Sequence, residues 1–168
     1  MANLELTTAS PSTNPRGDDA MAHGKIIRID RSIPIFYPDW VEKPMHPELE
    51  ATGPAEYNLG DVEQWLHEKQ KTGVAGGKEI YEYLKSADDL KNHHDLRDLL
   101  AIQKLGIEVF RKHFKGKAVF GWKSVVLSRN YGGLSVPYLI ERGGEVVLCW
   151  IWLGYGWDAR SPALRFGK

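Results

Sequence analysis

The chain has 168 residues, the usual size of one domain, and its hydrophobic (42%) and charged (26%) fractions are those of an ordinary globular protein. Lys plus Arg and Asp plus Glu number 22 each, so the net charge is zero. This balance argues against a general nucleic-acid binder, because such proteins carry a basic excess that neutralises phosphates. Cys149 is the single cysteine, which excludes an internal disulfide and the disulfide-rich secreted class.

Residues 1–22 lack the basic stretch followed by an apolar stretch that marks a secretory signal. They are poor in large apolar side chains and rich in Ser, Thr, Pro and Asn, so they are predicted to be a disordered tail, and Met21 is a second plausible start. The longest apolar run, 146–153, is too short for a membrane helix of about 20 residues. We therefore expect a cytoplasmic protein with no membrane partner.

Residues 23–168 are predicted to form a single α+β domain whose first part, 23–57, is a proline-rich extended arm. Residues 25–30 are rich in β-branched residues and predict a short strand. Prolines then recur at positions 34, 38, 44, 47 and 54, which suits an arm or an edge strand because proline cannot donate to a central ladder. Phe36, Tyr37 and Trp40 are expected to anchor this arm to the body.

Residues 58–116 are predicted to form three helices. The first is expected to begin at Asn58 as N-cap and end at Gly73, and the second follows Gly76 and Gly77. The third is the longest: it starts at Asp95, runs to 116 and carries apolar residues on two sides. Gly106 lies in its middle, where we expect a close crossing with a strand.

After residue 116 the hydrophobic period becomes two, which predicts strands at 118–127, 134–141 and 146–153 and a short last strand at 163–166. Glycine-rich turns at 130–133 and 142–144 make neighbouring strands antiparallel. The predicted fold is therefore α+β, with a helical N-terminal half of three helices packed on a C-terminal antiparallel meander (117–168) of three to four strands.

No pattern in the chain predicts a catalytic residue, a metal site or a cofactor. His93 and His94 are adjacent, so their imidazoles diverge on a helix and do not converge on one ion. Cys149 has apolar neighbours that do not favour a thiolate. The segment 73–79 resembles a phosphate loop but has Glu79 where a magnesium-binding hydroxyl is required.

Two features remain as candidate sites. The first is a basic cluster beside aromatic residues, a combination used by single-strand nucleic-acid platforms; its members are Arg111, Lys112, Lys115, Lys117 and Lys123. The same residues also suit the C-terminal dipole of a helix followed by a solvated strand face.

The second feature is aromatic. Trp150 and Trp152 are two residues apart and share one face of a strand, while the opposite face is also apolar. The strand leads into the loop 154–160, which carries Tyr155, Trp157 and Arg160. One face of the strand can pack on the long helix. The other must be covered by the arm 33–47 or by another molecule, or else form an exposed patch, and Trp and Tyr are frequent interface residues.

The leading functional hypothesis is a small non-enzymatic protein-binding or regulatory module that binds another protein through Trp150, Trp152, Tyr155, Trp157 and Arg160. One alternative is a nucleic-acid-associated protein that uses the basic cluster. The other is a small enzyme whose acid and base residues meet only in the fold, with the candidates His67, His94, Glu141 and Asp158.

Overall fold

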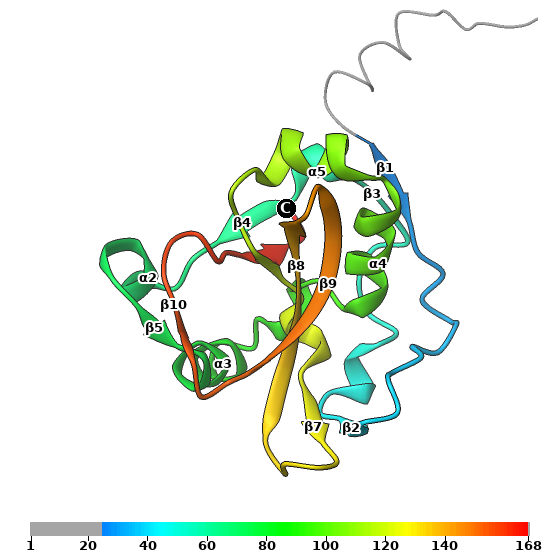
Figure 1. The fold of residues 1–168 in the computed structure, drawn as a ribbon. Helices are drawn as coiled ribbons and strands as arrows, with labels where there is room; N and C mark the ends of the chain where they lie inside the picture. The colour runs from blue at the N-terminus through cyan, green and yellow to red at the C-terminus, as the bar shows by residue number, and fades with distance from the viewer. Residues whose placement is uncertain (1–24, 168) are drawn as a thin grey trace, which may run out of the picture.

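The computed structural model describes residues 25–167, so the predicted tail at 1–22 lies outside the described residues. Helices occupy the middle of the chain and strands come both before and after them (Figure 1). The helices are α2 (Glu68–Thr72), α3 (Gly77–Ser86), α4 (Leu96–Lys104) and α5 (Ile107–Phe114). Across 25–167, none of them is long and apolar enough to cross a membrane.

Seven strands form one mixed sheet: β2 (Val41–Pro44), β4 (Glu63–Trp65), β6 (Val119–Phe120), β7 (Val126–Ser128), β8 (Leu134–Arg142), β9 (Glu145–Trp152) and β11 (Ala163–Arg165). Two small antiparallel pairs complete the described strands: β1 (Ile26–Arg28) with β3 (Glu56–Asn58), and β5 (Ala75–Gly76) with β10 (Gly156–Trp157).

Strand β8 organises the large sheet. One edge of β8 pairs with β9 along its whole length, from Ser135 opposite Trp152 to Arg142 opposite Glu145. The other edge pairs with β7 near its start and with β6 further along. β7 continues to β2, while β6 continues to β11 and then β4. The β6–β11 pair is parallel, which makes the sheet mixed.

The predicted fold class is wrong, because the N-terminal half supplies strands to the sheet and is not a helical layer. β2 comes from the predicted arm and pairs with β7, and β4 comes from the predicted first helix and pairs with β11. Asn58 does act as a cap, accepting a hydrogen bond from the Gly60 amide at 2.8 Å, but it caps a single 3₁₀ turn at Leu59–Asp61. The apolar spacing in this segment resembles a helix, and pairing with β11 overrides it.

The predicted third helix is also wrong in its length, because it divides into α4 and α5 at Gly106. This residue has φ of 92°, a backbone conformation that glycine adopts without strain. A Cβ added at Gly106 would meet nothing within 4 Å, so the expected close crossing with a strand is absent. The predicted strand 118–127 is likewise interrupted, since the 3₁₀ turn Trp122–Ser124 separates β6 from β7.

Local signals predicted other elements correctly. The strands expected at 134–141 and 146–153 are confirmed as the hairpin β8–β9, and α3 begins at Gly77 as expected. Asp95 caps α4 in a capping box with Asp98, whose side chain accepts a hydrogen bond from the Asp95 amide.

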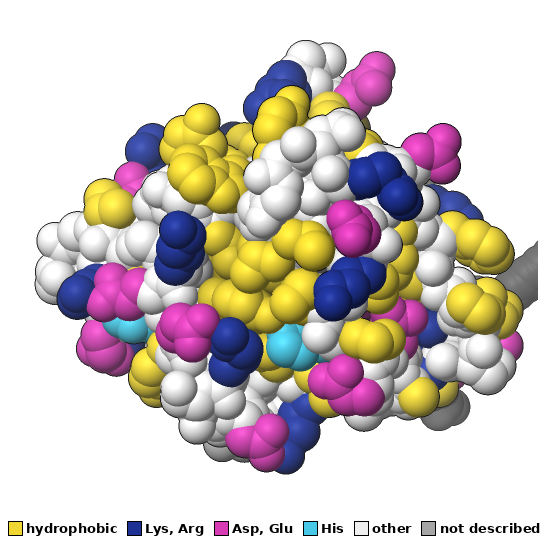
Figure 2. Space-filling model, turned by 90° about the horizontal axis from the view of Figure 1, so that it is seen from below, with side chains coloured by type: hydrophobic (Ala, Val, Ile, Leu, Met, Phe, Trp, Pro, Cys, Tyr) yellow, Lys and Arg dark blue, Asp and Glu magenta, His cyan; other side chains and the backbone are white. Residues whose placement is uncertain are grey.

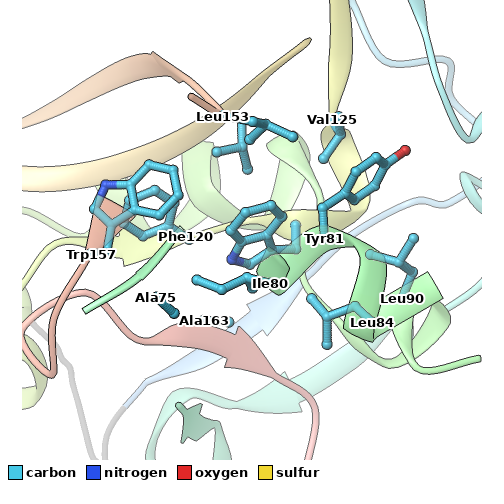
Figure 3. Packing of buried hydrophobic residues seen from close by; sticks show 12 residues of the cluster. Ala75, Ile80, Tyr81, Leu84, Leu90, Phe120, Val125, Leu153, Trp157 and Ala163 are labelled. Carbon is cyan, nitrogen blue, oxygen red and sulfur yellow. The ribbon is translucent and has the colours of Figure 1, made fainter. Parts of the chain in front are cut away.

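Two hydrophobic clusters pack on the sheet. Between α3 and the sheet lie Ile80, Leu84, Phe120, Trp122 and Trp157 among others, and the labelled side chains of Figure 3 show Trp157 beside Phe120 at one end of this cluster. The second cluster joins α4 and α5 to the sheet through Leu99, Ile102, Phe110, Leu139 and Leu164 among others. Neighbouring residues Val119 and Phe120 enter different clusters, so the middle of the sheet is covered on both faces.

Candidate functional site: an aromatic groove

A groove of about 850 Å³ lies between α3, the β7–β8 turn and the end of β9. This size is within the range of binding sites for small molecules and peptide segments. Figure 2, the view from below, shows hydrophobic side chains gathered in the middle of a face with charged side chains around them. The groove is lined by Lys78, Tyr81, Glu82, Ser128, Tyr131, Gly132, Gly133, Leu134, Ser135, Trp152, Leu153 and Tyr155.

The α3 wall is fixed by its first turn. The amides of Gly77 and Lys78 donate to the carbonyls of Tyr155 (2.8 Å) and Leu153 (3.1 Å), so the loop after β9 takes two of the hydrogen-bond donors that a helix N-terminus leaves open. A Cβ at Gly77 would collide with the Trp157 ring, and glycine therefore permits this close approach. The segment 73–79 resembles a phosphate loop in sequence, but the amides of Gly77 and Lys78 already bond these carbonyls and are not available to a phosphate.

Trp152 forms the floor of the groove at the end of β9. Its indole ring lies against Gly133 and Gly154, where an added Cβ would press into the ring. Lys78 places its ammonium 5.7 Å from the centre of the ring, and the Tyr155 ring meets it edge-on at 5.9 Å. Half of the Trp152 surface nevertheless remains exposed, so the ring is held in place and still accessible.

Tyr131 also lines the groove, on the turn between β7 and β8, and is 89% exposed. The turn is closed by two main-chain hydrogen bonds, from the Ser128 amide to the Gly133 carbonyl at 2.8 Å and from the Gly132 amide to the Ser128 carbonyl at 3.1 Å. Gly132 has φ of 66°, which favours glycine at this position of the turn. A rigid turn therefore presents a fully exposed aromatic side chain beside the groove.

Tyr81 closes the inner end of the α3 wall. Its hydroxyl lies 2.6 Å from Nε2 of His46, whose Nδ1 is 3.5 Å from the Glu48 carboxylate. Burial raises the pKa of Tyr81 to about 12, and burial also lowers the pKa of His46. The hydroxyl and the imidazole are therefore both neutral at neutral pH, while the Glu48 carboxylate lies beside the imidazole and the Lys85 ammonium lies 4.3 Å from the centre of the Tyr81 ring.

The structure separates the five predicted partner-binding residues. Trp152 and Tyr155 line the groove and are exposed. Trp150 packs edge-on against Trp40 of the arm, with ring centres 5.1 Å apart, so the arm covers this part of the strand. Trp157 is 8% exposed and belongs to the core (Figure 3).

Arg160, the fifth predicted residue, points elsewhere. Its guanidinium pairs with the Asp158 carboxylate at 3.0 Å on the surface of the loop, and it does not line the groove. The aromatic loop therefore divides between core, groove and surface within a few residues.

The basic cluster is not a single exposed patch. Lys123 is 2% exposed and donates to the Thr52 hydroxyl at 3.1 Å, and burial lowers its pKa to about 8. Arg111 is paired with Glu141 at 2.5 Å, and Lys117 donates to the Gln64 side chain at 2.7 Å. Lys112 lies in the last turn of α5, and Lys115 is the residue that directly follows this helix.

The candidate acid and base residues are dispersed over the fold. His67 caps α2 by accepting from the Lys69 amide at 3.1 Å. Glu141 and Asp158 are engaged in the surface ion pairs with Arg111 and Arg160. His94 is fully buried. Within 25–167 no three His, Cys, Asp or Glu side chains are grouped as metal ligands would be.

A buried ionic cluster, which sequence reasoning did not find, joins the arm to α4. Arg31 donates to both carboxylate oxygens of Asp98 at 3.0 Å, and the Tyr57 hydroxyl donates to the same carboxylate at 2.7 Å. Asp95 bonds Arg97 at 2.8 Å. The carboxylates are thus fully engaged, and the cluster fixes the arm against the start of α4. Arg31 lies far from Asp98 along the chain, so no local signal could reveal the pair.

His94 and Lys123 complete this cluster beneath the ring of Phe166. The ring centre of Phe166 lies 4.7 Å from that of His94 and 5.4 Å from the Lys123 ammonium. Neither ring nitrogen of His94 has a hydrogen-bond partner among residues 25–167, and burial lowers its pKa to about 4. His94 is therefore a neutral core residue and does not line the groove.

Sequence reasoning identified the β9 side of the groove but not the α3 side, because Lys78 and Glu82 approach Trp152 only in the tertiary structure. Comparisons with protein-family models, with curated proteins and with solved structures find no match. The groove itself is therefore the feature from which a function can be inferred.

Proposed function

We propose that the protein is a non-enzymatic binding module of the cytoplasm, which holds an extended segment of a partner protein in the aromatic groove. The observation that carries this proposal is the exposure of Trp152, Tyr155 and Tyr131 around one hollow of about 850 Å³. Large aromatic side chains contribute most of the binding energy at many protein interfaces, and burial of these rings would add apolar contact area.

The main-chain groups around the groove favour a particular kind of segment. The amides of Gly77, Lys78 and Leu153 already donate to protein carbonyls, and the amides of Ser128 and Tyr155 do so as well. A ligand that adds a β-strand needs free main-chain partners, and these five amides offer none. A polyproline II segment needs no such ladder, because it has no regular main-chain pairing.

The side chains supply the groups that a polyproline II segment uses. The hydroxyls of Tyr131 and Tyr155 and the indole nitrogen of Trp152 form no hydrogen bond with any other residue in the described chain. They can donate to the ligand's carbonyls while their rings pack against its prolines. A proline-rich extended segment is therefore the ligand class that the groove suits best.

The proposal is tested by selecting binders from a random displayed-peptide library with the full chain. We expect proline-containing peptides that bind the wild-type protein and lose at least tenfold in affinity to the Trp152→Ala and Tyr155→Ala variants. Phe36→Ala is the matched control, because Phe36 is 84% exposed but does not line the groove.

Selected peptides that bind all three variants equally would contradict the groove as the site. Peptides that depend on Trp152 but contain no proline would retain the groove and overturn the proposed segment class.

A further inference from the structure

The outer edge of β9 carries main-chain groups that no other strand within residues 25–167 uses. In this part of the chain β9 pairs only with β8, so it is an edge of the large sheet. Leu153 and Leu134 are the pair that follows Trp152 and Ser135 in the β8–β9 register. The Leu153 amide donates to the Leu134 carbonyl at 3.0 Å, so this is a hydrogen-bonded pair. Because main-chain groups alternate in direction along an antiparallel strand, odd-numbered residues of β9 bond β8 and even-numbered residues point outward. Pro137, which has no amide hydrogen, stands opposite Trp150 and agrees with this assignment.

The outward carbonyls are occupied at the two ends of the strand and not in its middle. The Val146 carbonyl accepts from the Gln103 side chain at 3.0 Å, and the Trp152 carbonyl accepts from the Tyr155 amide at 3.3 Å. Leu148 and Trp150 lie between them, and neither main chain has a partner among the described side chains and loops. Two amides and two carbonyls therefore remain for another strand.

The other edges of this sheet have a composition, register or length that opposes strand addition, and β9 does not. β2 contains Lys43 and Pro44 and has an irregular register with β7, and β4 has only three residues. Charged residues, proline, irregularity and shortness all protect sheet edges. β9 has eight residues without proline, and its sole charged residue is Glu145 at the start. Its sequence is that of a strand which accepts a neighbour.

We infer that the outer edge of β9 binds the same edge of a second copy of this chain, in an antiparallel pair whose two-fold axis passes beside Cys149. Only this register pairs Leu148 of each copy with Trp150 of the other, so that all four unused groups of each edge are bonded at once. A two-fold axis at Leu148 or at Trp150 would instead direct one of these residues to Val146 or Trp152, whose carbonyls are already engaged. This pairing does not depend on the groove, and it would join the large sheets of two copies into one continuous sheet.

The register predicts a measurable contact. With the axis beside Cys149, the two Cys149 residues face each other as a non-hydrogen-bonded pair, for which the Cα separation is about 4.5 Å. A disulfide requires about 4.4–6.8 Å between Cα atoms, so mild oxidation links the two copies. Cys149 is half-buried and is the sole cysteine of the chain, so any disulfide between copies joins these two residues.

The test compares two variants by sedimentation equilibrium of the full chain. Trp150→Pro removes the outward amide without removing a bond to β8, whereas Trp150→Thr keeps that amide and equally loses the contact with Trp40. We expect the wild type and Trp150→Thr to form dimers and Trp150→Pro to dimerise about tenfold or more weakly. Circular dichroism of each variant establishes that it is folded.

A wild-type protein that stays monomeric at about 100 µM would overturn the inference, since an edge pair of this kind must form within reach of such a concentration. Equal dimerisation of the two variants would place the interface elsewhere. Oxidation of the wild type with copper phenanthroline decides the register even where Trp150→Pro fails to fold. A disulfide-linked dimer that forms at low protein concentration supports the axis at Cys149, and a dimer without the disulfide excludes it.

Discussion

At the scale of single residues, two tryptophans close together in sequence have different roles. Trp152 lies exposed over two glycines, and Trp157 is buried against Phe120 and Trp122. Hydrophobic periodicity could not separate them, because the local sequence does not show which of the two rings the rest of the fold covers. The difference arises at Gly77, far away in the chain, where the missing side chain leaves room for the Trp157 ring.

This difference predicts losses of stability of different size for the same substitution at the two positions. Trp157→Ala removes a buried aromatic ring and is expected to lower the unfolding free energy by about 3–5 kcal/mol. Trp152→Ala removes a half-exposed ring and is expected to cost less than about 1 kcal/mol. Urea denaturation followed by circular dichroism measures both, and similar losses in the two variants would show that Trp152 is a core residue.

The buried imidazole of His94 makes stability depend on pH. Its pKa is lowered by burial from the ordinary 6.5 to about 4, so between these values the unfolded chain binds a proton that the folded chain does not. Stability contributed by the neutral imidazole is complete above pH 6.5 and is lost as the pH falls toward 4. Asp98, Arg31, Lys123 and the Phe166 ring surround it and hold no bond to its nitrogens.

We expect the unfolding free energy to fall by on the order of 3 kcal/mol between pH 7 and pH 4 because of this group. Chemical denaturation at a series of pH values measures the slope. A His94→Phe variant, which cannot take up the proton, should show a clearly flatter slope over the same range. An unchanged slope in that variant would assign the dependence to other groups.

At the scale of elements, the sequence allowed those features to be predicted whose signals are local. The helix start at Asp95, the start of α3 and the β8–β9 hairpin all depend on residues a few positions apart, and all were predicted. β2 and β4 are only three or four residues long, and each is a strand because of its partner. β11 is equally short, but a last strand was expected at 163–166 and is confirmed at Ala163–Arg165. The Trp152 side of the groove was predictable for the same reason, whereas its α3 wall depends on tertiary packing.

The docking of α3 gives a matched test at adjacent glycines. Gly77→Ala places a methyl group against the Trp157 ring and the Leu153 carbonyl, so we expect a loss of about 1–3 kcal/mol in unfolding free energy. Gly76→Ala enters open space at an ordinary backbone conformation, with φ of −70°, and should change stability by less than about 1 kcal/mol. Thermal and urea unfolding compare them; equal effects would contradict the close packing of α3 on the loop after β9.

At the scale of the whole molecule, the last strand connects two parts of the sheet. β11 lies between β6 and β4, and Ala163 and Leu164 are fully buried within it. The carbonyl of Leu164 also accepts from the His94 amide at 3.0 Å. The two hydrophobic clusters therefore both depend on a strand that comes after every other element of the sheet.

A chain that ends at residue 162 is accordingly expected to lose cooperative unfolding, because β4 and β6 lose their shared neighbour. A chain that ends at Phe166 keeps β11 and is the matched control. Differential scanning calorimetry distinguishes the two, and a cooperative transition in the shorter chain would show that the sheet is stable without β11.

Binding in the groove can be followed through the indole signals of the six tryptophans. A peptide selected on the protein is titrated into ¹⁵N-labelled chain while the indole N–H resonances are followed by nuclear magnetic resonance. The structure predicts the largest change at Trp152 and little change at the buried Trp122 and Trp157. Saturating binding that leaves the Trp152 resonance in place would contradict the assignment of the groove as the binding site.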